Sequence, residues 1–187
     1  MKININEEIF FYIVLICYLY LIYRIIGKSR KRNKTAELIM IIFGIYIFKV
    51  ISLVFFPILI QFGSNIIERS PIIWLNPINS WIHIIKNNDI YGILYNIVGN
   101  LVLLFPLPIF LIYFYKKKVD SLLRMLIICF LVSFGIESFQ YIESILISGV
   151  GRFIETNDII LNTTGGVLGY IFYDRCLRKL LNNWKYM

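Results

Sequence analysis

The chain consists of long apolar runs separated by short polar segments. The apolar runs cover residues 9–26, 38–62, 91–115, 122–146 and 159–173. An α-helix rises about 1.5 Å per residue, so about 20 apolar residues cross the roughly 30 Å hydrocarbon core of a bilayer. The pattern therefore predicts an all-α integral membrane protein, a bundle of about five transmembrane helices.

Lysine and arginine residues gather on one side of these predicted helices. The segments that follow the first and fifth runs carry five and four of them, and the segment after the third run carries four when Arg124 in the first turn of the fourth run is included. The segments on the other side carry one, two and one. Cytoplasmic loops of membrane proteins collect Lys and Arg. The distribution predicts an N-terminus outside the cell and a C-terminus inside it.

The segment at 63–90, between the second and third runs, is apolar but interrupted. It holds Trp74 and Trp81 among many isoleucines, and Pro71 and Pro77 break it. Tryptophan favours the headgroup zone of a bilayer. We expect an interfacial or re-entrant segment here; the alternative is a sixth half-span that only packs against the bundle.

The composition supports the membrane class. Of 187 residues, 59% are hydrophobic and 16% are charged, whereas soluble domains have about 45–50% apolar and about 25% charged residues. An ordinary cytosolic enzyme, a disordered tail and a disulfide scaffold are thereby excluded. Abundant Ile, Asn and Lys are typical of an AT-rich bacterial genome, so we expect a multi-pass protein of a bacterial plasma membrane.

Charge and cysteine content exclude further classes. The net charge of +8 comes from short runs between apolar segments, which indicates topology rather than nucleic-acid binding. One histidine and three cysteines without a CxxC pair predict neither a metal site nor a cofactor. The chain also contains no GxSxG, HExxH, P-loop or dinucleotide-binding glycine motif.

Polar side chains inside three of the runs are predicted to lie at one depth. The third and fifth runs begin outside and carry amide or acidic residues near that end, whereas the fourth begins inside and reaches Glu137 roughly 22 Å along. Such groups cost free energy in a membrane and are functional candidates. The layer comprises Asn96, Asn100, Glu137, Gln140, Asp158 and Asn162.

Local spacing indicates how these helices meet. Each polar pair is separated by three or four residues and therefore shares one helix face. Gly165 and Gly169 form a GxxxG pattern, which lets helices approach closely. Pro106 is expected, with Pro108, to kink the third run.

The start of the fifth run carries a capping signal. Thr156 and Asn157 precede Asp158 and are predicted to cap the helix, with Asp158 at its positive end.

Two interpretations of the polar layer remain open from the residues alone. In the first it is a clamp, in which Arg152 and Asp158 tie the outer loop and Glu137 and Gln140 bond to Asn96 or Asn100. Arg152 could then pair with Glu137 or Asp158. In the second, the same groups form a polar pocket that opens to the outer leaflet and binds a polar or amphiphilic ligand.

Three blocks of the sequence resemble the VanZ-like family. They are NIVGNLVLLFPLP at 96–108, ESFQ at 137–140, and Arg152 followed by NDIILNTTGGVLGY at 157–170. The resemblance covers roughly residues 40–173, which we take as the VanZ-like membrane domain. Residues 1–39 then form the first transmembrane helix and a basic cytoplasmic loop, and residues 174–187 a basic cytoplasmic tail.

The resemblance implies a role at the cell envelope. The family is named for a membrane protein that accompanies glycopeptide resistance clusters in Gram-positive bacteria, where it is linked to low-level teicoplanin resistance. The matching family positions are Asn96, Asn100, Glu137, Gln140, Arg152, Asp158, Asn162 and Gly165.

We carry two functional hypotheses. In the first, the protein is not an enzyme, and those positions other than Gly165 bind a membrane lipid, a cell-wall precursor or a lipoglycopeptide, with Arg152 meeting an anionic group. In the second, it is a membrane-embedded hydrolase or transferase on a lipid-linked precursor. Glu137 or Asp158 is then the general acid or base, and Arg152 stabilises developing charge.

Overall fold

The structure, a computed structural model, describes only part of the chain. The described residues are 2–5, 12, 14–16, 18–20, 22–23, 34–56, 58–61, 71–78, 82, 90–147 and 152–179. They belong to two compact units, which are considered separately. Unit 1 comprises Met1–Arg69 with Ile147–Val150, and unit 2 comprises Ser70–Leu146 with Gly151–Met187.

Unit 1 contains one long helix and a two-stranded sheet. The helix is α2 (Lys34–Phe55), and β1 (Lys2–Ile5) pairs antiparallel with β2 (Ile58–Gln61). The helix therefore ends at Phe55, earlier than the predicted second span of 38–62. Because a residue before proline avoids the helical conformation, Phe56 ahead of Pro57 ends the helix.

The predicted first span is described only in part. Its described residues, 12, 14–16, 18–20 and 22–23, are helical, and the others lie outside the described chain. Tyr18 packs against α2: its hydroxyl donates a hydrogen bond to the Met40 carbonyl, and its ring meets Phe48 edge to face at 5.2 Å.

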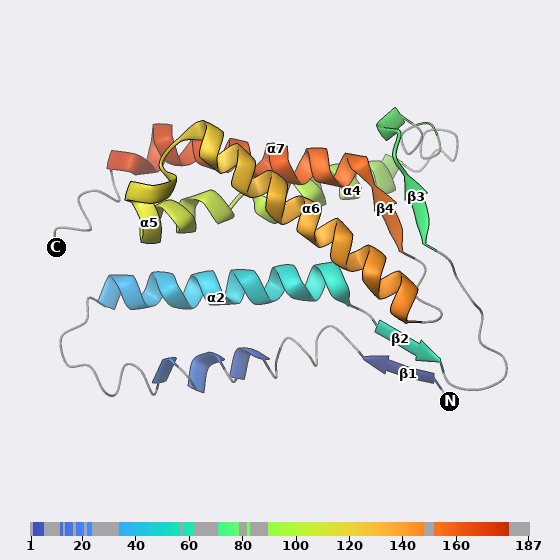
Figure 1. The fold of residues 1–187 in the computed structure, drawn as a ribbon. Helices are drawn as coiled ribbons and strands as arrows, with labels where there is room; N and C mark the ends of the chain where they lie inside the picture. The colour runs from blue at the N-terminus through green and yellow to red at the C-terminus, as the bar shows by residue number, and fades with distance from the viewer. Residues whose placement is uncertain are drawn as a thin grey trace. The chain divides into compact units, whose positions relative to one another are not determined.

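Unit 2 is predominantly helical (Figure 1), and the residues of the predicted polar layer lie in it. Its elements are β3 (Ile72–Trp74), α4 (Ile90–Leu104), α5 (Leu107–Val119), α6 (Leu122–Leu146), β4 (Phe153–Glu155), α7 (Thr156–Phe172) and the π-helical turn η1 (Tyr173–Leu177). The third run is broken between α4 and α5, as Pro106 predicts, because proline lacks an N–H group and clashes with the preceding turn. Pro108 lies fully buried at the start of α5.

Three described helical stretches are long and apolar enough to cross a membrane. They are Ala36–Phe55, Tyr91–Tyr115 and Leu122–Leu146, which correspond to the predicted second, third and fourth spans. The predicted fifth span is α7, whose 17 residues extend for about 25 Å. The helical fold thus has the features of a membrane protein.

Helix α6 is more polar inside than outside. Its outward positions are mostly large apolar side chains, among them Leu123, Phe130 and Phe139. The buried positions are Met125, Cys129, Ser133, Glu137, Glu143 and Ser144. A helix on a water-soluble protein shows the opposite arrangement. Apolar residues facing outward and polar residues facing the bundle are what a lipid environment favours.

Helix α7 is held against α4 through glycines. A methyl group on Gly165 would overlap the carbonyl oxygen of Leu101, and one on Gly169 would overlap that of Phe105. Both contacts advance by four residues along each helix, so α4 and α7 run parallel. The GxxxG pattern therefore brings two backbones together, as predicted.

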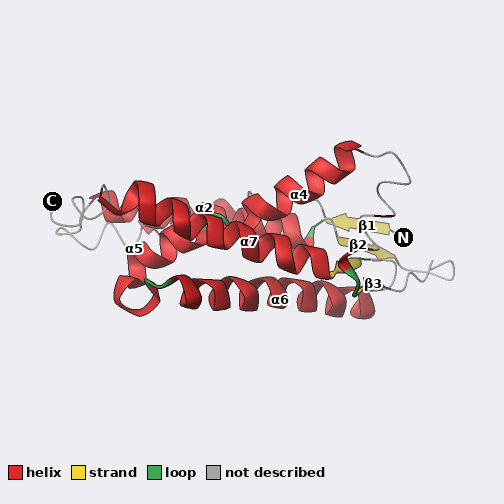
Figure 2. Ribbon diagram, turned by 90° about the horizontal axis from the view of Figure 1, so that it is seen from above, coloured by secondary structure: helices red, strands yellow, loops and turns green. Residues whose placement is uncertain are grey.

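On its other side α7 packs against α6, which extends beside it (Figure 2). A methyl group on Gly166 would overlap the Cys129 sulfur atom, while the N–H group of Glu155, just before α7, reaches Glu137 further along α6. These two contacts show that α6 and α7 run antiparallel. The directions of α4, α6 and α7 are those that three successive spans would have.

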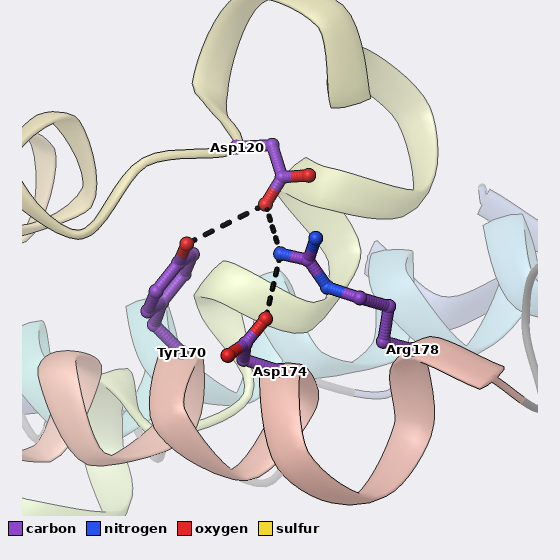
Figure 3. Close-up of polar contacts among 4 residues, drawn as sticks. All are labelled: Asp120, Tyr170, Asp174 and Arg178. Carbon is purple, nitrogen blue, oxygen red and sulfur yellow. Dashed lines mark hydrogen bonds and ion pairs between the residues drawn. The ribbon is translucent and has the colours of Figure 1, made fainter.

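The far end of α7 is fastened by an ion-pair cluster that the sequence analysis did not anticipate (Figure 3). One terminal nitrogen of Arg178 lies 2.7 Å from a carboxylate oxygen of Asp120 and 2.7 Å from one of Asp174. The Tyr170 hydroxyl donates to Asp120 at 3.5 Å. The turn between α5 and α6, which contains Asp120, is thereby tied to the last turns of α7 and η1.

The glycine contact generates the first prediction. Replacing Gly165 with alanine should lower the free energy of unfolding by about 1–3 kcal/mol, because the added methyl group pushes α7 away from α4. Thermal unfolding of the protein in detergent measures the loss. Gly99→Ala is the matched control, since a methyl group there meets no atom within 4 Å. Equal stability of the two variants would contradict this packing.

The ion-pair cluster generates the second prediction. Arg178→Gln should destabilise the protein by about 1 kcal/mol, because it removes two partly exposed ion pairs. Arg175→Gln, at an exposed position of η1, should change stability by much less. Thermal unfolding at low and high salt checks the assignment. An Arg178→Gln loss that salt does not reduce would argue against an electrostatic cause.

Candidate functional site

Two predicted residues of α4 meet one predicted residue of α7. The Asn100 amide nitrogen donates to a carboxylate oxygen of Asp158 at 2.7 Å, and it also lies 3.4 Å from the Asn96 side-chain oxygen. Asp158 accepts a hydrogen bond from Asn96 as well. All three side chains remain partly exposed. The parallel packing of α4 on α7 thus brings these polar groups together although they lie 58 or more residues apart in sequence.

Glu137 from α6 meets the start of α7. Its carboxylate accepts a hydrogen bond from the backbone N–H group of Glu155 at 3.3 Å, and only 4% of the residue is exposed. The first N–H groups of a helix have no partner within the helix and favour a negative charge. Glu137 therefore stabilises the start of α7 from a neighbouring helix.

The predicted capping of α7 is corrected by this contact. The N-cap residue is Glu155 rather than Thr156 or Asn157, and its own side chain makes no capping hydrogen bond. The Asn157 side chain instead donates to the Pro77 carbonyl oxygen at 2.7 Å. It thereby fastens part of the predicted interfacial segment to α7.

Arg152 has a different carboxylate partner from those that the sequence suggested. A terminal nitrogen of Arg152 lies 3.3 Å from one oxygen of Glu143 and 3.4 Å from the other. Its backbone N–H group donates to the Ser144 hydroxyl at 3.1 Å. Arg152 directly precedes β4 and lies beside Glu143 and Ser144 near the end of α6, which is why it meets Glu143 rather than Glu137 or Asp158, the partners that the sequence suggested.

Asn162 lies one turn deeper than Asp158 on α7. It is 1% exposed, and its side-chain oxygen has no hydrogen-bond partner among the described residues. Gln140, on α6, is partly exposed and lies about one turn beyond Glu137. The predicted polar layer therefore occupies the facing sides of α4, α6 and α7, with Asn162 at its buried end.

Acidic groups exceed basic groups around this layer. Glu155 and Asp158 lie at the start of α7, and Glu137 of α6 accepts the Glu155 N–H group there. Among the described residues between the middle of α6 and the first turn of α7, Glu143 is a fourth acid and Arg152 is the basic residue. No described group of three or more His, Cys, Asp or Glu residues is arranged to hold a metal ion.

The layer borders an apolar surface formed by β3 and β4. These strands pair in parallel, with Ile72 opposite Phe153 and Trp74 opposite Glu155, and the Trp74 and Phe153 rings meet at 5.5 Å. Several side chains on and beside the strands are exposed, which we call the apolar rim: Ile72, Ile73, Leu75, Ile78 and Phe153. Residues 71–78 and 82 are the described part of the predicted interfacial segment before α4 begins. The pairing of β3 with β4 was not predicted from the sequence.

Several residues of this region were missed in the sequence. Ser144 follows Glu137 by seven residues, or about two turns, so its position on the same helix face was a usable signal; Glu143 lies next to it in sequence. Ser133 precedes Glu137 by one turn and carried the same signal. Glu155 and Asn157 gave none, because their partners lie on other elements.

A family model described as VanZ/LLP1 matches residues 43–178, which include α4 to α7 and every predicted site residue. Neither the curated proteins nor the solved structures contain a match. Since the match spans well over half of the chain, the protein belongs to the VanZ/LLP1 family.

Proposed function

We propose that this protein binds an amphiphile of the bacterial cell envelope and does so without catalysing a reaction. The bound molecule is a membrane lipid, a cell-wall precursor or a lipoglycopeptide. Its binding contributes to resistance against teicoplanin-type glycopeptides or to maintenance of the envelope. The site is the polar layer between α4, α6 and α7, facing the outer leaflet of the plasma membrane.

The observation that carries the proposal is the partly exposed Asn96–Asn100–Asp158 cluster beside the apolar rim. An amphiphile has a polar head and a long apolar part, and this region offers a surface for each. Binding sites of small molecules commonly combine apolar walls with a few convergent polar groups. Trp74, whose ring packs against Phe153 of the rim, suits the headgroup depth of a bilayer.

Two further arguments support the proposed location. The basic segments predict that α4 and α7 begin on the outer side, which places Asp158 in the outer half of the membrane. Teicoplanin-type drugs carry an acyl chain and act at that surface. Membership of the VanZ/LLP1 family is consistent with such a role.

The enzyme alternative is less well supported because Glu137 is already engaged. Its carboxylate is almost fully buried and accepts the Glu155 N–H group at 3.3 Å. A general acid or base must reach the substrate proton within hydrogen-bond distance. Glu137 therefore suits the stabilisation of α7 better than proton transfer.

The charge of Asp158 provides a test of binding against a purely structural clamp. Asp158→Asn keeps an oxygen that can accept the Asn100 hydrogen bond but removes the negative charge. We expect normal protein abundance, with at least a fourfold fall in the teicoplanin concentration that cells tolerate and no change for vancomycin. Asp174→Asn, at the opposite end of α7, is the matched control and should behave as wild type. Unchanged teicoplanin tolerance in Asp158→Asn cells would favour the purely structural clamp over ligand binding.

Glu137 separates the binding protein from the enzyme. Glu137→Gln retains an acceptor oxygen for the Glu155 N–H group, so abundance and teicoplanin tolerance should stay within about twofold of wild type. Glu137→Leu leaves that N–H group unpaired and should lose about 1–3 kcal/mol of stability. Immunoblots of membranes and susceptibility assays measure both effects. Abolished resistance in a normally abundant Glu137→Gln protein would favour catalysis.

A further inference from the structure

The polar layer holds more hydrogen-bond acceptors than donors. Asp158 accepts hydrogen bonds from the Asn100 and Asn96 side chains, and Glu137 accepts one from the Glu155 N–H group. A carboxylate can accept about four hydrogen bonds, so both retain capacity. Below them, the Asn162 side-chain oxygen and the Ser133 hydroxyl oxygen have no partner among the described residues.

The packing register places Ser133 and Asn162 at the same level. Cys129 of α6 contacts Gly166 of α7, and one helical turn shifts this antiparallel pairing by four residues in each helix. Ser133 then faces Asn162, and Glu137 faces Asp158 one turn further. The short contact of Glu137 with Glu155 agrees with this register.

Ser133 and Asn162 are too deeply buried for their hydrogen bonds to be supplied by bulk solvent. Ser133 is 0% exposed and Asn162 is 1% exposed. A buried polar atom without a partner costs about 1–3 kcal/mol of stability, and most such atoms in proteins are paired. Side chains of a helix lean toward its N-terminus, so the side chain of Asn162 leans toward the turn that carries Asp158. An occupant between α6 and α7 that donates hydrogen bonds would satisfy these oxygens.

We propose that the polar layer binds the primary ammonium group of an amphiphile, with its three N–H donors directed at Asp158, Asn162 and Ser133. This inference rests on the proposed function and specifies the class of its ligand. An ammonium group provides three donors and one positive charge. Four acidic residues and Arg152 lie in this part of the described chain, and Arg152 is ion-paired with Glu143, so a cation is the charge that this region accepts.

The hypothesis that Arg152 meets an anionic group is replaced by this assignment. The ligand's positive head lies among the acceptors, and its apolar part extends along the apolar rim. A lipid headgroup and a small free amine offer the same ammonium chemistry. The apolar rim, which a free amine would leave unused, favours the lipid.

Lipid titrations of the full chain in a non-ionic detergent test the proposal. Dilauroyl phosphatidylethanolamine carries a primary ammonium group, whereas dilauroyl phosphatidylcholine has the same phosphate, charge and chains but no N–H donor. Native mass spectrometry should report saturable binding that is at least about tenfold tighter for phosphatidylethanolamine, because the loss of even one charge-assisted hydrogen bond gives this ratio. Free ethanolamine should bind at least tenfold more weakly than its lipid.

The variants use a matched pair of buried serines. Ser133→Ala should weaken phosphatidylethanolamine binding about threefold to tenfold and leave phosphatidylcholine binding unchanged. Ser52→Ala is the control, because Ser52 on α2 is equally buried and its hydroxyl also has no partner. Asn162→Leu should weaken phosphatidylethanolamine binding further. If that variant does not fold, the comparison of Ser133→Ala with Ser52→Ala still tests the proposal.

Other results would overturn the inference in distinguishable ways. Equal, saturable binding of both lipids would refute recognition of the ammonium group while leaving the proposed amphiphile-binding function standing. Equal affinity for ethanolamine and phosphatidylethanolamine would refute the claim that the ligand is an amphiphile. If Ser133→Ala and Ser52→Ala bound phosphatidylethanolamine equally well, Ser133 would not be part of the site. If neither lipid bound saturably and Asp158→Asn left teicoplanin tolerance unchanged, both proposals would fail.

Discussion

The contact between α7 and α4 at Gly165 and Gly169 governs the rest of unit 2. Without side chains at these positions, the backbone of α7 lies directly on the carbonyl groups of Leu101 and Phe105. In a lipid environment such close packing provides much of the attraction between helices, because burying apolar surface from lipid yields little free energy. The separation of α4 and α7 also decides whether Asn100 can reach Asp158, so the polar seam depends on the glycines.

The polar residues of unit 2 form two sets. One set fastens the fold, and the other remains partly exposed and is the set proposed to bind a ligand. Glu137 stabilises the start of α7, Glu143 holds Arg152, and Asn157 holds the chain at Pro77. Asp158, Asn96 and Asn100 remain partly exposed next to the apolar rim. The contacts that fasten the fold and the residues proposed to bind a ligand are thus adjacent groups that share α7.

The sequence predicted the helices and the meeting of their polar faces more accurately than it predicted partners. The fourth predicted span coincides with α6, and Pro106 marks the break between α4 and α5. The predicted partner of Arg152 was wrong, because that contact depends on where Arg152 itself lies relative to Glu143 and Ser144 at the end of α6. The capping of α7 was wrong for a similar reason: Thr156 and Asn157 are favoured caps, but Glu137 of another helix lies at that position.

Apolar run length, basic segments and residue spacing by themselves determined a helical membrane protein with a polar layer on three helices. These properties are local, since each follows from about one helix of sequence and the cost of burying polar groups in lipid. Only the tertiary structure decided that Asn100 bonds to Asp158, that Glu143 pairs with Arg152, and that Ser133 and Asn162 are buried without a side-chain oxygen partner among the described residues. Those pairings depend on the register and crossing of whole helices, which side-chain volumes at the contacts set and which no single segment encodes.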